Sequence, residues 1–165
     1  MPIQKWTILS ALVRILEKFQ EMKSMTEKVF IDSNIFIYAY TGDDEQKHSV
    51  ARDLLRYNVL NNKIILSVQI LNEFYAVMAK YKYPHSEIKL CLNEIIEQVT
   101  VMPLELETIK RCIFIKEKYC YSWWDSLVLT SALENDCVIL YSEDLRCNQI
   151  VENKLEIVNP FAFGL

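Results

Sequence analysis

Short apolar segments alternate with longer segments of helical periodicity along most of this chain. The apolar segments are predicted β-strands at residues 29–31, 64–67, 99–102, 138–141 and 156–158. Strands of this kind are typical of a parallel sheet buried on both faces, because parallel neighbours need long crossover connections that are usually helical. We therefore predict an α/β protein, a three-layer α/β/α sandwich around a central, mostly parallel five-stranded sheet.

Helices are predicted between these strands at residues 45–60, 68–81, 84–98 and 105–118, and from a cap at Ser122 to Asn135. An extra N-terminal helix is predicted over residues 6–22, whose apolar face consists of Trp6, Leu9, Leu12, Val13, Leu16 and Phe19. Met25 opens a second start-like segment directly before the first strand. We therefore predict a helical extension over residues 1–24 and one domain over residues 25–165.

The composition is that of one ordinary globular domain. The 165 residues are 52% hydrophobic and 24% charged, with only two glycines and four prolines to form linkers. No apolar run approaches the ~20 residues that cross a bilayer, and the first ten residues lack the features of a secretory signal, so we expect a cytoplasmic protein. The five cysteines lack the spacing of a zinc site, and we expect them to be reduced and buried.

The formal net charge of −4 provides no overall basic field to attract a polyanion. This charge counts mildly against nucleic-acid binding. It does not exclude it, because a metal ion in an acidic pocket inverts the local charge and holds phosphate. The arrangement of the acidic residues is therefore the feature to follow.

Four acidic residues far apart in the sequence are predicted at one edge of the sheet. Asp32 directly follows the first strand, and Asp144 follows the strand at residues 138–141. Glu73 lies in the first turns of the helix after the second strand, and Asp125 lies near the start of the helix that leads into the fourth strand. All of these positions belong to the carboxyl edge of a parallel sheet, where such folds bind ligands.

Each acid alone has a structural explanation, whereas the four together indicate a metal. Asp32 is suited to cap a helix starting near Asn34, and Asp125 is suited to the N-terminus of its own helix. Glu73 suits a solvated helix face and Asp144 suits a turn. Crowded carboxylates, however, raise each other's pKa and destabilise the fold unless a cation joins them.

An all-oxygen donor set favours Mg²⁺ or Mn²⁺ over zinc. The chemistry predicted with such an ion is attack of a metal-activated water on a phosphodiester. Asp32 and Asp125 are predicted as direct ligands, and Asp144 as a further ligand. Glu73 is predicted to complete the site and to orient or deprotonate the water.

The segments that carry these acids are IDSNIFIY, SVQILNEFY, SWWDSLVLTSAL and LYSEDL. They resemble the four acid-bearing motifs of the PIN-domain nucleases, specifically the VapC-type toxins. The resemblance covers about residues 28–161, including the closing VNPF, and its motifs fall in the family order, which makes it specific. It implies a Mg²⁺- or Mn²⁺-dependent endoribonuclease that cuts single-stranded or loop RNA, usually as a homodimer, and is silenced by an antitoxin protein.

The resemblance also bears on residues beside the acids. Asn34 and Ser142 match polar positions of the family and are expected to hydrogen-bond the metal ligands. Asp144 is preferred over Glu143 as the fourth acid because it lies two residues beyond Ser142, but Glu143 stays an alternative. The extension at residues 1–24 departs from the family pattern. It is hypothesised to pack on the domain, to mediate oligomerisation or to mimic an antitoxin tail.

Some aromatic and basic residues have two interpretations each. Stacking of an RNA base on Trp123 or Trp124 is one hypothesis, and core packing or a dimer contact is the preferred one for at least one of them. A segment rich in tyrosine and lysine is interpreted as an RNA-facing patch or, preferably, as a solvated helix end: Tyr75, Lys80, Tyr81, Lys82 and Tyr83. His48 and His85 have no partner acid in a catalytic spacing and are assigned no role.

Rival functions are weaker. An aspartate-dependent phosphatase needs a second aspartate where Asn34 stands, and a phospho-receiver needs a lysine soon after the fourth strand, where none precedes Lys154. A catalytically inactive PIN-like module that binds RNA or protein is the alternative to the nuclease. It ranks below the nuclease because all four acids are present.

Overall fold

The computed structural model describes residues 27–60 and 63–162 of the chain. In chain order its elements are β1 (Lys28–Ile31), α2 (Ser33–Thr41), α3 (Glu45–Leu60), β2 (Ile64–Ser67), α4 (Val68–Lys80), α5 (His85–Gln98), β3 (Thr100–Met102), α6 (Leu106–Tyr119), α7 (Trp123–Glu134), β4 (Cys137–Tyr141), β5 (Ile150–Val151) and β6 (Leu155–Val158). The strands form one sheet in the order β3-β2-β1-β4-β6-β5. Neighbours pair in parallel except β5 and β6, which are antiparallel.

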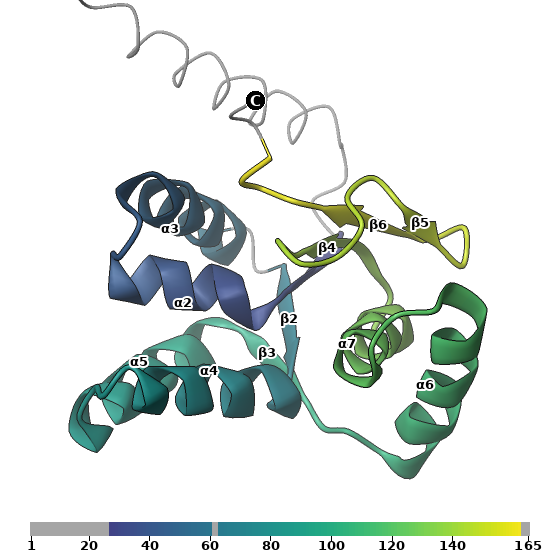
Figure 1. Ribbon diagram of the computed structural model, residues 1–165, viewed down its shortest axis with the longest axis horizontal. Coiled ribbons are helices and arrows are strands. Elements are labelled where there is room, and N and C mark those ends of the chain that lie inside the picture. Colours follow the sequence, from purple (N-terminus) through teal and green to yellow (C-terminus); the bar gives the residue numbers. More distant parts are fainter. Residues whose placement is uncertain (1–26, 61–62, 163–165) are drawn as a thin grey trace, which may run out of the picture.

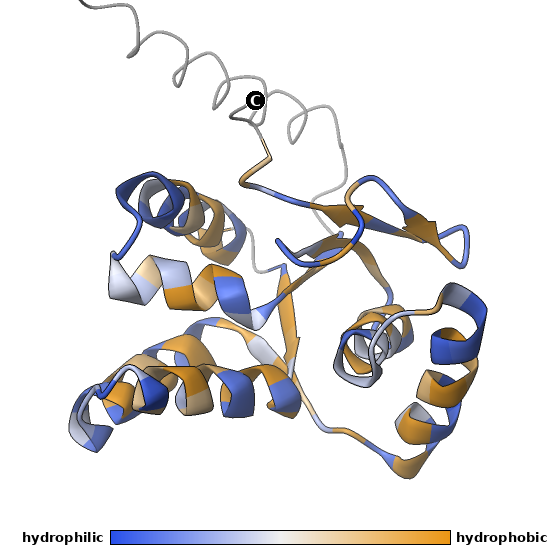
Figure 2. Cartoon of the chain, in the orientation of Figure 1, coloured by the Kyte–Doolittle hydropathy of each residue, from blue (hydrophilic) through white to orange (hydrophobic). Residues whose placement is uncertain are grey.

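The helices cover the two faces of this sheet as separate layers. Helices α2, α3, α4 and α5 lie on one side of the strands, and α6 and α7 lie together on the other side (Figure 1). Apolar positions dominate the strands and the helix surfaces turned toward them, whereas hydrophilic positions mark the outer helix surfaces (Figure 2). The structure therefore confirms the predicted three-layer α/β/α sandwich.

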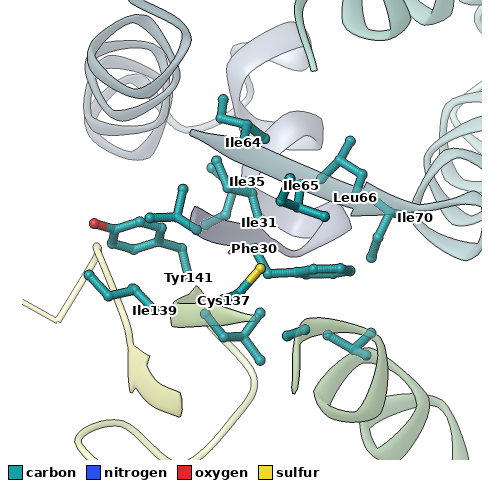
Figure 3. Close-up of a cluster of buried hydrophobic side chains, with 14 of the residues drawn as sticks. Phe30, Ile31, Ile35, Ile64, Ile65, Leu66, Ile70, Cys137, Ile139 and Tyr141 are labelled. Atoms are coloured by element: carbon teal, nitrogen blue, oxygen red, sulfur yellow. The ribbon is translucent and has the colours of Figure 1, made fainter. Parts of the chain in front are cut away.

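Strand β1 lies at the centre of the core because it pairs with β2 on one side and β4 on the other. Its residues Phe30 and Ile31 are fully buried. Figure 3 shows them among side chains of the two neighbouring strands, including Ile65 of β2 and Ile139 of β4. Burial on both faces explains why this strand is a continuous apolar run in the sequence.

Helix α7 is buried around its whole circumference, from Ser126 to Leu133, because it packs between the sheet and α6. Its polar side chains are accommodated by bonds to its own backbone. Ser126 Oγ donates to the Ser122 carbonyl at 2.7 Å, and Thr130 Oγ1 donates to the Ser126 carbonyl at 2.7 Å. A buried polar group is tolerated when its hydrogen bond is made in this way.

The prediction of five strands is wrong, since the sheet has six. The missed strand, β5, is only two residues long and pairs antiparallel with β6. A tight turn joins them, in which Glu152 and Asn153 have φ angles of 52° and 53°. Two residues cannot show a hydrophobic period, and the Glu-Asn pair lacks the glycine that usually marks such a turn.

Helix α2 is the helix near Asn34 that Asp32 is suited to cap. It is present, Asp32 is its N-cap, and Gly42 ends it with a left-handed φ of 68°. The other helix and strand predictions agree with the structure to within one residue at each end. The predicted helix over residues 6–22, and the boundary between residues 24 and 25, lie outside the described residues.

The cysteines are unpaired, as predicted, but only some are buried. Cys112 and Cys137 lie in the interior, whereas Cys120 and Cys147 are exposed. Both exposed thiols lie outside the regular elements, at the end of α6 and in the segment before β5, where no packed face covers them. Across the described residues, no helix has the length and apolar character that a membrane crossing requires.

Candidate active site

The fold places the four acids at the carboxyl edge of the parallel strands. Asp32 follows β1 directly, and its backbone N–H donates to the Tyr141 carbonyl at the end of β4, at 2.9 Å. Asp144 lies three residues beyond β4. Glu73 is in the second turn of α4, and Asp125 is in the first turn of α7, both of which are helices that begin at this edge.

Asp32 is the buried member of the group, with a relative exposure of 8%. Its Oδ2 accepts a hydrogen bond from Ser142 Oγ at 2.7 Å, and its Oδ1 accepts one from the Ser33 backbone N–H at 2.7 Å. Burial raises the pKa of Asp32 from 3.8 to about 6. The two hydrogen bonds oppose this shift, and the negative charges of Glu73 and Asp144 add to it, so both of these carboxylates lie within electrostatic reach of Asp32.

Glu73 is held by two side-chain donors. Ser33 Oγ donates to Glu73 Oε2 at 2.9 Å and also lies 3.4 Å from Asp32 Oδ1, so one hydroxyl joins both acids. Gln69 Nε2 donates to Glu73 Oε1 at 2.7 Å and lies 3.3 Å from the Trp124 carbonyl. Gln69 thereby connects Glu73 with the residue before Asp125.

Asp144 is joined to the same network through two contacts. Asn34 Nδ2 donates to Asp144 Oδ2 at 3.1 Å. The Asp144 backbone N–H donates to Ser142 Oγ at 3.3 Å, and this hydroxyl in turn donates to Asp32. Its neighbour Glu143 is instead ion-paired with Lys47 of α3.

Asp125 is held by its own helix cap rather than by the other acids. Ser122 Oγ donates to Asp125 Oδ2 at 2.7 Å and accepts from the Asp125 backbone N–H at 3.2 Å. Its route to the other acids, along the hydrogen bonds described above, runs through the Trp124 carbonyl and Gln69. The structure thus joins Asp32, Glu73 and Asp144 in one network and places Asp125 beside it.

The fit of these residues to a metal ion is a matter of donor chemistry. Within the described residues, no three or more acid, histidine or cysteine side chains converge closely enough to form a coordination sphere. The buried oxygens Asn34 Oδ1 and Gln69 Oε1, whose amide nitrogens bind Asp144 and Glu73, have no hydrogen-bond donor. Hydrated Mg²⁺ would supply such donors through its waters, and carboxylate oxygen is its preferred protein ligand. The donor chemistry therefore fits a hydrated divalent cation, bound in part through its waters.

Sequence reasoning missed two residues of this network, Ser33 and Gln69. The available signals were local. Ser33 is next to Asp32 in sequence, and Gln69 precedes Glu73 by four positions, the spacing at which side chains on one helix meet. Serine and glutamine are common at such positions for other reasons, so neither signal was specific.

The remaining residues singled out in the sequence lie at the border of the site or outside it. Trp124 is 61% exposed beside Asp125, whereas Trp123 is half-buried. Tyr75 contacts His85, and the tyrosine- and lysine-rich segment continues to the far end of α4, beyond Glu73. His48 Nδ1 contacts the Tyr38 carbonyl at 2.9 Å.

A cavity of about 940 Å³ lies between α2, α3 and α5, and none of the four acids lines it.

Comparison with known families agrees with the observed fold. The sequence model of the PIN domain family matches residues 29–153, which is most of the chain. The chain belongs to the PIN domain family. No curated protein shows a significant match to this PIN domain.

Solved structures share the fold of this PIN domain at low sequence identity. A toxin–antitoxin complex from Klebsiella pneumoniae superposes with a TM-score of 0.62 at 14% identity, covering 81% of this chain and 98% of that one. VapC20 of Mycobacterium tuberculosis, a toxin that cleaves the sarcin-ricin loop, gives 0.58 at 14% identity, covering 68% and 87%. VapBC2 of Rickettsia felis, bound to a DNA fragment from its promoter, gives 0.61 at 16% identity, covering 79% and 98%.

Proposed function

We propose that this PIN domain is a Mg²⁺- or Mn²⁺-dependent endoribonuclease that hydrolyses RNA phosphodiester bonds, acting as the toxin of a toxin–antitoxin pair. The observation that carries the proposal is the network at the carboxyl edge of the sheet. Three acids from separate parts of the chain, Asp32, Glu73 and Asp144, are joined there through two serine hydroxyls. Ser33 contacts the carboxylates of Asp32 and Glu73, and Ser142 binds the Asp32 carboxylate and the Asp144 backbone N–H. Fold-stabilising residues have no reason to gather like charges in this way, because their mutual repulsion destabilises the fold.

The residues that would hold the ion are Asp32, Asp125 and Asp144, with Glu73 completing the site. When bound, the ion supplies Lewis acidity toward the phosphate and lowers the pKa of a water, the nucleophile of hydrolysis. Glu73 would orient the attacking water and accept its proton. Its own orientation is set from both sides, by Ser33 and by Gln69.

Asn34 and Ser142 fix the orientation of the metal ligands. Ser142 Oγ is shared between the Asp32 carboxylate and the Asp144 backbone, so it determines the spacing of the two acid-bearing segments. Asn34 determines the direction of the Asp144 carboxylate. Groups that hold metal ligands in this way typically change metal affinity or activity by about 10–100-fold when removed.

The same proposal includes the partners and location of this protein. An antitoxin protein is the expected inhibitor, since solved relatives of this fold include toxin–antitoxin complexes. A homodimer is the expected assembly, as the resemblance to VapC-type toxins implies. A toxin of this kind meets its RNA in the cytoplasm, which is the location we propose.

A catalytically inactive PIN-like module that binds RNA or protein is the second candidate. The observation in its favour is that, among the described side chains, no three acids lie close enough together to coordinate an ion. Such a module would keep the fold and the hydrogen-bonded acids without using them in hydrolysis. It predicts RNA binding without cleavage.

Cleavage of varied RNAs with added Mn²⁺ separates the two candidates. We expect the wild-type protein to cleave and Asp32→Asn to lose at least about 100-fold in rate, since it removes a proposed metal ligand. Asp136→Asn is the matched control, because Asp136 lies just before β4 at the opposite edge of the same sheet. Equal cleavage by wild type and Asp32→Asn would eliminate the proposed site, and binding without cleavage by any variant would favour the inactive module.

A further inference from the structure

Glu143 and Asp144 are adjacent in sequence but are held by different partners. Asp144 accepts from Asn34 at the end of the acid network, whereas Glu143 Oε1 is ion-paired with Lys47 Nζ. Both side chains of this ion pair are about one-quarter exposed, Lys47 at 27% and Glu143 at 25%. Two successive acids are therefore separated by their binding partners at the edge of the proposed active site.

Lys47 is fixed by more than the ion pair. Its Nζ donates to Tyr38 Oη at 3.0 Å and lies 4.5 Å from the centre of the Tyr38 ring and 5.5 Å from that of Phe161. The two rings pack edge to face with their centres 5.1 Å apart. The negative charge of Glu143 and the Tyr38 hydroxyl raise the pKa of Lys47, which keeps it charged. These contacts hold the ammonium group in one position.

The segment that carries Glu143 is held from the other side by the chain after β6. The Ser142 backbone N–H donates to the Val158 carbonyl at 3.1 Å, and Asn159 Nδ2 lies 3.4 Å from the Glu143 carbonyl. Asn159 Oδ1 in turn accepts from the Phe161 backbone N–H at 2.8 Å. Residues 142–144 are thus tied to β6 through their backbone and to α3 through the Glu143 side chain.

We propose that Lys47 is a positioning residue for the Asp144 ligand, which it controls by holding the side chain of Glu143. This inference rests on the proposed function. Without Lys47, Glu143 is a free carboxylate adjacent to Asp144 in the sequence, and it competes with Asp144 for the same cation or repels the Asp144 carboxylate. With Lys47 in place, Glu143 is neutralised and turned away, and Asp144 alone extends from this segment toward Asn34.

The rival role for a lysine at this edge is direct contact with an RNA phosphate. The geometry disfavours it, because the ammonium group already binds a carboxylate and a phenol and lies against two rings. The two roles differ in how they depend on Glu143. A positioning lysine acts through Glu143, whereas a phosphate-binding lysine acts without it.

A double-mutant cycle in the full-length protein tests this dependence. We expect Lys47→Met to raise the Mn²⁺ concentration for half-maximal cleavage by about 10-fold. Adding Glu143→Ala to this variant should recover most of the metal affinity, because the competing carboxylate is then absent. Methionine keeps the packing against Tyr38 and Phe161, so the fold should be retained, which thermal unfolding checks. Lys47→Arg keeps the positive charge beside Glu143, and this variant should retain most of the metal affinity of the wild type.

Lys118→Met is the matched control, because Lys118 also forms a long-range ion pair, with Glu152 at 2.7 Å on another part of the surface. It should leave the Mn²⁺ dependence unchanged. A double variant as impaired as Lys47→Met, or a loss of RNA affinity at constant Mn²⁺ dependence, would overturn the positioning role. A Lys47→Met variant with the Mn²⁺ dependence of the wild type would overturn the positioning role as well.

Direct Mn²⁺ binding, measured by calorimetry on the same variants, separates failure of this inference from failure of the proposed function. If the wild-type protein binds Mn²⁺ but cleaves no RNA, the proposed nuclease fails. Weaker binding by Lys47→Met than by wild type would still support the positioning role in that case. Equal Mn²⁺ binding by the two proteins, or no binding by either, would overturn it.

Discussion

Asp32 has two tasks that make opposite demands on its surroundings. As the N-cap of α2 it accepts a backbone hydrogen bond from Ser33, which stabilises the helix. As a proposed metal ligand it has to carry its charge while it is buried beside Glu73 and Asp144, which destabilises the metal-free protein. The raised pKa of about 6 reflects this conflict.

The conflict predicts that Asp32→Asn stabilises the metal-free protein, and only above acidic pH. The folded pKa of about 6 lies above the unfolded value of 3.8, so the carboxyl favours the folded state below pH 3.8 and loses this contribution as the pH rises through 6. The asparagine variant does not titrate. In EDTA at pH 7.5 we expect it to be more stable than wild type by up to about 3 kcal/mol, and at pH 3.5 to be equal.

Urea unfolding at the two pH values measures this difference. Asp136→Asn is the control, since the pKa of Asp136 is lowered by its hydrogen bond with Lys154 and its loss should give no stabilisation at pH 7.5. A stability gain of Asp32→Asn that is the same at both pH values would show that the cause is packing rather than buried charge.

At the scale of the element, the N-terminus of α7 determines where Asp125 lies. Ser122 caps the helix through the Asp125 backbone N–H and also binds the Asp125 carboxylate. The helix behind this cap is buried along eight consecutive residues, so its axis has little freedom to move. Orientation of Asp125 therefore depends mainly on the cap.

Ser122→Ala should consequently affect stability and activity together. Loss of an N-cap hydroxyl costs about 1 kcal/mol of unfolding free energy. The freed Asp125 carboxylate should also lower the cleavage rate by about 10-fold. Ser122→Thr keeps the hydroxyl and is expected to behave like wild type in chemical unfolding and in cleavage. Equal behaviour of the alanine and threonine variants would show that the cap contributes to neither property.

At the scale of the whole molecule, one core supports both helical layers. Phe30 of the central strand β1 is fully buried, and the cluster to which it belongs includes residues of α2, α4 and α7. The acids lie at the end of these same strands. The geometry of the site therefore depends on the stability of the sheet that carries it.

Phe30→Ala should destabilise the protein by about 3–5 kcal/mol, because it removes buried apolar surface and leaves a cavity at the centre of the core. Phe114→Ala is the matched control, since Phe114 on α6 is 53% exposed and its loss should change stability by less than about 1 kcal/mol. Urea unfolding followed by circular dichroism measures both. Similar losses for the two variants would contradict a single core centred on β1.

Local pattern was sufficient to predict most elements and the edge where the acids gather. The helix at Glu45–Leu60 and the strand at Ile64–Ser67 have the predicted bounds, since a hydrophobic period follows directly from the secondary structure that buries it. The acid positions followed from the direction of parallel strands. The strand β5 was missed because two residues carry no period, and because its antiparallel pairing depends on a turn beside β6.

The sequence by itself determined the order of all elements but β5 along the chain, the apolar core and the four acids, because each follows from the type and spacing of neighbouring residues. Only the tertiary structure decided which side chains join the acids. Three side chains show this, because each contacts a residue far along the chain. Ser33 binds Glu73, Gln69 contacts the Trp124 carbonyl, and Lys47 pairs with Glu143. The tertiary structure also decided how Glu143 and Asp144 differ. They are adjacent and carry the same charge, but folding brings Lys47 to Glu143 and Asn34 to Asp144.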